Sequence, residues 1–137
     1  MITTATPLVG GAWTTVAGLT VTLPEVGRWV IRALIGYSLV LTDPPPRAQD
    51  AEAYARFVNV TQGLLYAEQA LVHYSSDNVY ATDVDNFEHS SMFGVVDSVA
   101  GADVIGVEVF RTVTPTWAVS TAGLRSHIIF MQATTDT

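Results

Sequence analysis

Residues 29–41 read WVIRALIGYSLVL and form the most hydrophobic window of this 137-residue chain. Side chains alternate across a β-strand, so Trp29, Ile31 and Ile35 would share one face and the residues between them the other. The window contains Arg32 and falls well short of the roughly 20 apolar residues that a membrane helix needs. It therefore predicts a buried strand.

Turn-forming residues divide the rest of the chain into short runs of similar character. Glycine, proline, asparagine and aspartate recur between segments rich in valine, isoleucine, threonine and aromatic residues, which is typical of an all-β protein. We expect a single antiparallel β-sandwich of about eight strands, of the jelly-roll type. The strands are expected over residues 13–16, 19–23, 29–41, 53–61, 64–74, 91–99, 104–113 and 124–133.

One segment competes for a helix. Residues 48–57 (AQDAEAYARF) follow three prolines, carry acidic side chains early and consist mostly of helix-forming residues. A short helix there is the alternative to a strand, and we expect at most this one. No internal repeat divides the chain, so we expect an extended N-terminal arm over 1–10, the jelly-roll domain over 11–134 and a C-terminal tail over 135–137.

The charge content limits the classes of partner. Only 14% of the residues are charged and 49% are hydrophobic, whereas about a quarter of an average soluble domain is charged. The net charge of −7 repels phosphate backbones, so we expect no nucleic-acid partner. The sequence shows no secretory signal, and we expect no membrane partner. So few charges favour a surface that is partly covered by copies of the chain or by another protein.

The closing strand is apolar on both faces. Ile128 and Phe130 point to one side, Ile129 and Met131 point to the other, and none of the four is charged. One side can fill the sandwich core, and the other needs cover from a neighbouring subunit or from long loops. We favour the subunit, and the alternation alone does not decide which set faces it. The candidate interface residues are Trp29, Ile31, Ile35, Ile128, Ile129, Phe130 and Met131.

No constellation of catalytic residues is visible. The sequence has no Gly-x-Ser-x-Gly nucleophile motif and no glycine-rich phosphate loop, and it has no cysteine. His73, His89 and His127 are scattered along the chain and read as ordinary strand or loop residues. We therefore expect no enzyme activity, no catalytic residue and no cofactor.

Two groups of side chains are alternatives for ligand binding. The acidic stretch from Asp83 to Glu88 offers oxygen ligands but lacks the spacing and the glycine of an EF-hand, so we expect a solvated loop and no metal. Whether that loop holds an ion is left open by the sequence. Trp13, Tyr80 and Trp117 could stack on sugars, yet aromatic residues at strand ends more often anchor packing.

Three stretches resemble a known family. Residues 18–37 (GLTVTLPEVGRWVIRALIGY) have a threonine-rich strand, a Pro-x-x-Gly turn and a strand of alternating aromatic and aliphatic residues. Residues 94–108 (GVVDSVAGADVIGVE) look like paired strands around an Ala-Gly hairpin, and residues 119–130 (VSTAGLRSHIIF) look like a closing strand. Together they resemble the tumour-necrosis-factor-like and complement-head-like trimeric jelly rolls of phage virion structural proteins.

The resemblance implies a homotrimer that decorates or stabilises a phage capsid, or forms a head fibre, bound to the major capsid protein or another virion component. Such a protein is made in the host cytoplasm and resides on the virion surface. The threonine-rich ends, residues 1–7 and 133–137, suit extended contacts with a neighbour. No collagen-like, coiled-coil or β-helical stalk precedes the motifs, which favours a compact protein on a shell. The alternative is a trimeric receptor- or glycan-binding head of a phage tail or fibre.

Overall fold

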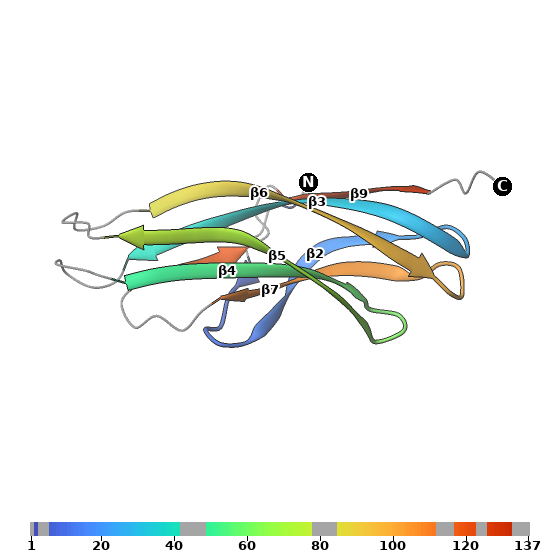
Figure 1. The fold of residues 1–137 in the computed structure, drawn as a ribbon, viewed down its shortest axis with the longest axis horizontal. Helices are drawn as coiled ribbons and strands as arrows, with labels where there is room; N and C mark the ends of the chain where they lie inside the picture. Colours follow the sequence, from blue (N-terminus) through green and yellow to red (C-terminus); the bar gives the residue numbers. More distant parts are fainter. Residues whose placement is uncertain are drawn as a thin grey trace.

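Nine β-strands and no helix occur in the part of the chain that the computed structural model describes, which comprises residue 2 and residues 6–41, 49–77, 85–111, 117–122 and 126–132. The strands form two sheets that pack face to face (Figure 1), which confirms the expected all-β sandwich. In chain order they are β1 (Thr6–Pro7), β2 (Trp13–Thr22), β3 (Gly27–Leu41), β4 (Gln49–Asn59), β5 (Leu64–Asp77), β6 (Asp85–Ser98), β7 (Val104–Arg111), β8 (Trp117–Ala122) and β9 (His127–Gln132).

The order of the strands in the two sheets is that of a jelly roll. One sheet runs β1-β8-β3-β6, with β9 also paired to β3, and the other runs β2-β7-β4-β5. Each sheet therefore mixes strands from both halves of the chain, as two Greek keys wound together require. The long strand β3 has β6 on one side and two strands on the other, because β9 pairs with residues 29–34 and β8 with residues 37–41.

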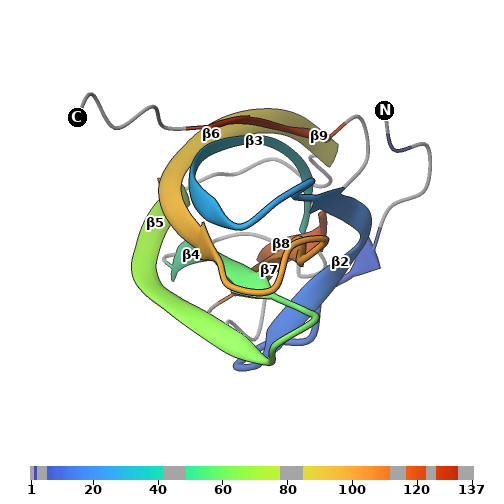
Figure 2. The ribbon, with the colours of Figure 1, turned by 90° about the vertical axis from the view of Figure 1, so that its right-hand side faces the viewer.

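The hydrophobic core lies between the two sheets and is built from alternate positions of each strand. On β3, Trp29, Ile31 and Ile35 are buried, so this set faces inward. The other core side chains come from strands of both sheets, which encircle the core in the end view of Figure 2. They include Val16, Leu19, Ala53, Ala55, Phe57, Met92, Val96, Ile105, Val107 and Val109.

Strand β2 was expected as two separate strands and is one strand with an irregularity in its middle. Val16 and Leu19 are both buried although they are three positions apart, a spacing that would put them on opposite faces of a regular strand. The pairing register with β7 shifts between Thr15 and Thr20. Gly18 lies within this shift at a φ of 74°, a backbone conformation that glycine adopts without strain. The bulge thus returns the second half of the strand to the core.

The helix considered over residues 48–57 is wrong, because residues 49–59 form strand β4. This strand lies between β7 and β5 and pairs with both. Ala53, Ala55 and Phe57 are buried at every second position, a period that fits a strand and not a helix. The local composition favours a helix, and pairing with two neighbouring strands outweighs it.

The N-terminal segment, expected as an extended arm, contributes to the sandwich, whereas the expected tail over 135–137 lies outside the described residues. Thr6–Pro7 forms β1 and pairs with β8, and Leu8 is buried in the core. Near the start, the Ile2 amide donates a 3.2 Å hydrogen bond to the Ser126 carbonyl, just before β9. At least part of the segment 1–10 is therefore a structural element of the sandwich.

Candidate interaction surface

The outward face of the five-stranded sheet carries an apolar cluster where β9, β3 and β6 lie side by side. Strand register brings two rows together: Val30 lies between Met131 and Val95, and Arg32 lies between Ile129 and Phe93. Residues one position away face the core, so these side chains point outward. We call this surface the outer patch; it consists of Val30, Phe93, Val95, Ile129 and Met131, which surround Arg32.

The apolar side chains of the outer patch are open to solvent in the single chain. Phe93, Val95, Ile129 and Met131 are between 52% and 67% exposed. A shallow hollow of about 330 Å³ lies within the patch, and its lining consists of Val30, Arg32, Phe93, Ile129 and Met131 together with Phe130 at the edge. Single exposed apolar residues are ordinary on a protein surface, whereas a contiguous exposed apolar group makes this surface the candidate for an interaction.

Arg32 is the only charged residue of the outer patch. Its guanidinium lies 5.4 Å from the centre of the Phe93 ring, which is a cation–π distance, and its Nη2 donates a 3.4 Å hydrogen bond to the Ser91 hydroxyl. No carboxylate among the side chains that the structure describes pairs with it. The patch therefore presents a cation within apolar surroundings.

The candidate interface residues divide between the core and this surface. Trp29, Ile31 and Ile35 are buried within their own sandwich and are not available to a partner. Ile129 and Met131 belong to the outer patch. On the opposite side of β9, Ile128 packs partly against the core, and Phe130 lies at the rim with its ring edge-on to Trp29 at a centroid distance of 5.3 Å.

Strand β9 is also a free edge of the sheet. Among the described strands it pairs only with β3. Its sequence, HIIFMQ, contains neither a proline nor a charged residue of the kind that usually protects an edge strand from pairing with other chains. The edge thus extends the apolar surface of the outer patch.

Of the three aromatic candidates for sugar stacking, the structure describes the side chain of Trp13 alone. One face of the Trp13 ring is covered by the Arg56 guanidinium at 4.0 Å, and Phe110 lies 5.5 Å away. Arg56 is held in turn by an ion pair of 2.7 Å to Glu108. Trp117 starts β8, but its side chain lies outside the described part of the structure, as does all of Tyr80.

The histidines and the acidic stretch lie mostly in strands. His73 is in β5, His89 in β6 and His127 in β9, and their side chains are outside the described part. The segment expected as a solvated acidic loop enters β6 at Asp85, while Asp83 lies outside the described residues. The register of β6 with β3 thus includes much of the acidic stretch.

Asp103 is a buried polar residue that the motif search missed. It follows the β6–β7 turn and is fully buried at one end of the sandwich. Its carboxylate accepts hydrogen bonds from Gln62 at 3.0 Å, the Val99 and Ala100 amides at 2.8 and 3.4 Å, and the Ser98 hydroxyl at 3.1 Å. These hydrogen bonds, of which the one from Gln62 has the largest effect, lower the pKa of Asp103 from its ordinary 3.8 to about 2. An aspartate after a glycine-containing turn is the sequence signal for such a role.

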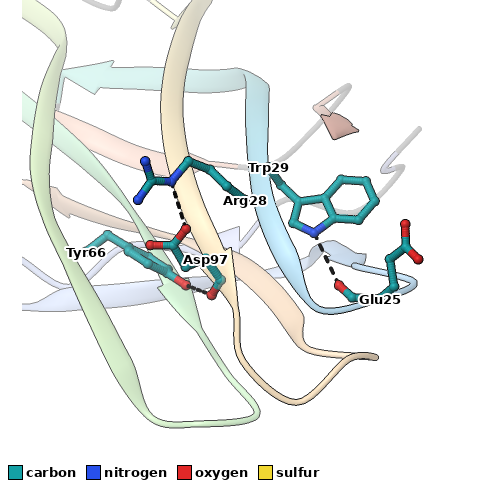
Figure 3. A network of polar contacts seen from close by, with 5 residues as sticks. All are labelled: Glu25, Arg28, Trp29, Tyr66 and Asp97. Carbon is teal, nitrogen blue, oxygen red and sulfur yellow. Dashed lines mark hydrogen bonds and ion pairs between the residues drawn. The ribbon is translucent and has the colours of Figure 1, made fainter. Parts of the chain in front are cut away.

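A second polar network lies beside this turn on the exposed ends of β3, β5 and β6 (Figure 3). Arg28 donates to Asp97 at 3.0 Å, and the Tyr66 hydroxyl donates to the Asp97 carbonyl at 3.3 Å. The Trp29 indole donates to the backbone carbonyl of Glu25 at 3.3 Å. The Glu25 carboxylate takes part in none of these bonds.

Among the described residues, no helix is long and apolar enough to span a bilayer. Within the same residues, no group of three or more histidine, cysteine or acidic side chains is placed to hold a metal ion. No protein-family model matches the chain, and no curated protein matches it.

Proposed function

We propose that this chain is a non-enzymatic structural protein that assembles into a homotrimer through the outer patch and decorates or stabilises the outside of a phage particle. The observation that carries the proposal is the patch itself. It is a contiguous apolar surface on the outward face of a sheet whose inward face already supplies the core. A sandwich without flanking helices obtains cover for such a face from another subunit.

The composition supports a covered surface. The apolar centre of a protein interface is depleted of charge and surrounded by a polar rim. The outer patch has one charge at its centre. The Arg28–Asp97 ion pair borders the patch along β3 and β6, and its two side chains are 62% and 60% exposed. This is the expected layout of an apolar centre with a polar rim.

The virion part of the proposal rests on the resemblance of residues 18–37, 94–108 and 119–130 to phage jelly rolls. In the structure the first stretch falls on β2 and β3, the second on β6 and β7, and the third on β8 and β9. In this proposal the partners are copies of the chain and a capsid or other virion component, and the protein resides on the particle surface.

Assembly is tested by light scattering on the purified chain. Wild type should have three times the 14.7 kDa mass of one chain at micromolar concentration. Met131→Asp should be monomeric with an unchanged fold, because Met131 is 67% exposed in the single chain and a charge there becomes buried only on assembly. The control is Val9→Asp, at a residue that is 64% exposed but outside the patch, which should remain trimeric. A monomeric wild type, or an oligomeric Met131→Asp, would overturn the proposed assembly.

The virion role is tested on purified phage particles by a protein inventory and by labelling with an antibody. The protein should be present in multiples of three on the shell. Its absence from particles would overturn the virion role, and its presence only at the tail tip would favour the receptor-binding alternative. Deletion of residues 1–7 would not test binding of the N-terminal segment to a shell, because it also removes β1 and the hydrogen bond from Ile2 to Ser126 and so disturbs the sandwich itself.

A further inference from the structure

The single charge of the outer patch determines what kind of surface can cover it. If two patches met around a two-fold axis, Arg32 of one copy would approach Arg32 of the other, and like charges would be buried together. A neutral apolar surface would bury the guanidinium without a counter-charge, which is also unfavourable. The surface that fits has apolar side chains around a free carboxylate.

One free carboxylate exists among the side chains that the structure describes. These carboxylates are Glu25, Asp97, Asp103 and Glu108. Asp97 pairs with Arg28 and Glu108 pairs with Arg56, at 3.0 and 2.7 Å. Asp103 is buried and receives four hydrogen bonds. Glu25 is exposed, and its carboxylate makes neither an ion pair nor a hydrogen bond with the described residues (Figure 3).

Glu25 lies among exposed apolar side chains at one end of the sandwich. Its neighbours in the β2–β3 connection are Pro24, which is exposed, and Val26, which is 60% exposed. The β6–β7 turn lies against this connection (Figure 2) and adds Val99, which is 64% exposed. We call Pro24, Glu25, Val26 and Val99 the acidic tip.

The acidic tip is held in place by its own hydrogen bonds. A Cβ at Gly101 would lie 3.7 Å from the Val26 amide nitrogen, so the two connections are in van der Waals contact. The Leu23 amide donates to the Asp103 carbonyl at 2.9 Å, and the Trp29 indole donates to the Glu25 carbonyl at 3.3 Å. A surface that is ordered before binding loses less conformational entropy when it binds.

From this complementarity, and on the basis of the self-assembly proposed above, we infer that the acidic tip of one copy binds the outer patch of the next, with Glu25 of that copy paired to Arg32. Val26 and Val99 fill the apolar hollow beside the ion pair. The contact is heterologous because two different surfaces meet, and a heterologous contact that closes after three copies gives a cyclic trimer.

A charge exchange tests this contact. The variants are Glu25→Arg, Arg32→Glu and the double exchange, and the readout is the dissociation constant of the oligomer from light scattering over a dilution series. Each single change should raise the dissociation constant at least about tenfold, since close interfacial charge pairs couple strongly. The double exchange should restore it to within about threefold of wild type, because the pair is re-formed with reversed charges.

Two controls separate this inference from other effects. Thr15→Arg adds a positive charge at an exposed position of β2, away from the tip and the patch, and should assemble as wild type does. Both exchanged residues are exposed in the single chain, so circular dichroism and thermal unfolding should show that every variant folds.

The possible failures are distinguishable. If Glu25→Arg assembles like wild type while Met131→Asp does not, the tip is not the occupant of the patch, and self-assembly through the patch still stands. The same conclusion follows if both single exchanges dissociate the oligomer and the double exchange does not restore it. A monomeric wild type would overturn the proposed function itself.

Discussion

Gly94→Ala is expected to destabilise the sandwich, and the structure allows its cost to be worked out. Gly94 lies on β6 opposite Ile31 of β3 and faces the core. A Cβ at this position would lie 2.7 and 2.8 Å from the Cδ2 and Cε2 atoms of Phe57, whereas ordinary contacts of a Cβ are 3.4–4 Å. The Phe57 ring would therefore have to move by at least about half an ångström, although it is buried among densely packed neighbours.

Two opposing contributions set the size of the effect. Overpacking of a core typically costs about 1–3 kcal/mol. Replacement of a glycine whose backbone conformation suits alanine gains about 0.4–1 kcal/mol from the unfolded state, and Gly94 has no positive φ. The net loss should be about 1–2 kcal/mol, which for a domain of this size corresponds to a fall in Tm of roughly 3–10 °C.

The assay is a double-mutant cycle by urea unfolding, with Phe57→Leu as the second change and all proteins at one concentration so that assembly contributes equally. Leucine has no Cε2 atom, and its Cδ methyl groups can turn away from the new methyl group by a rotamer change that a rigid ring cannot make. Gly94→Ala should therefore cost little in the Phe57→Leu background, and the two changes should couple by about 1 kcal/mol or more. Equal costs in both backgrounds, or a Gly94→Ala protein as stable as wild type, would refute the steric reasoning.

Three further changes test polar contacts of the fold. Asp103→Asn should lower the urea midpoint at neutral pH, because the pKa of Asp103 is lower in the folded state than in the unfolded state and its carboxylate therefore stabilises the fold above pH 3.8. This stabilisation is lost as the pH falls toward 2, so the urea midpoints of the two proteins should converge there. A difference between the midpoints that does not depend on pH would contradict the assignment. Ser126→Ala removes the hydroxyl that accepts a buried 2.8 Å hydrogen bond from the Gly36 amide, which should cost about 1–3 kcal/mol by denaturant titration, whereas Ser126→Thr should retain most of it. Arg56→Met keeps much of the aliphatic stem but leaves Glu108, whose side chain is only 17% exposed, without its ion pair. The free energy of unfolding, measured by urea titration at pH 7, should fall by about 1–3 kcal/mol. An unchanged free energy of unfolding would show that the ion pair is dispensable.

Much of the fold follows from local sequence patterns. The period of two in residues 29–35 predicts a strand with Trp29, Ile31 and Ile35 on one face, and these residues are buried together. Turn residues likewise mark the β6–β7 connection near Gly101, which has a φ of 69°. Such signals are readable because each depends on neighbouring residues and on the fixed geometry of the backbone.

Other elements could not be predicted because their stability comes from partners that are distant in the chain. Strand β8 is only six residues long and lies outside the strands that the turn residues predict, and the stretch 119–130 that resembles one closing strand falls on two strands, β8 and β9. Strand β8 is stabilised by pairing with β3 and β1 on either side. Residues 49–59 have helix-forming composition, and their pairing with β5 and β7 makes them a strand. The bulge near Gly18 had to be seen in three dimensions to explain why Val16 and Leu19 are both buried.

The candidate surface shows the same division between local and tertiary information. The apolar residues of β9 predict by themselves that one of its faces needs cover, because side chains alternate along a strand. Only the tertiary structure decides that Met131 and Ile129 face outward and that Val30, Arg32, Phe93 and Val95 lie beside them. Likewise, only the tertiary structure places the β6–β7 turn against the β2–β3 connection, where a Cβ at Gly101 would lie 3.8 Å from the Glu25 Cα atom. The physical reason is that these neighbours are set by strand order and register, which depend on the packing of the whole chain and not on any single segment.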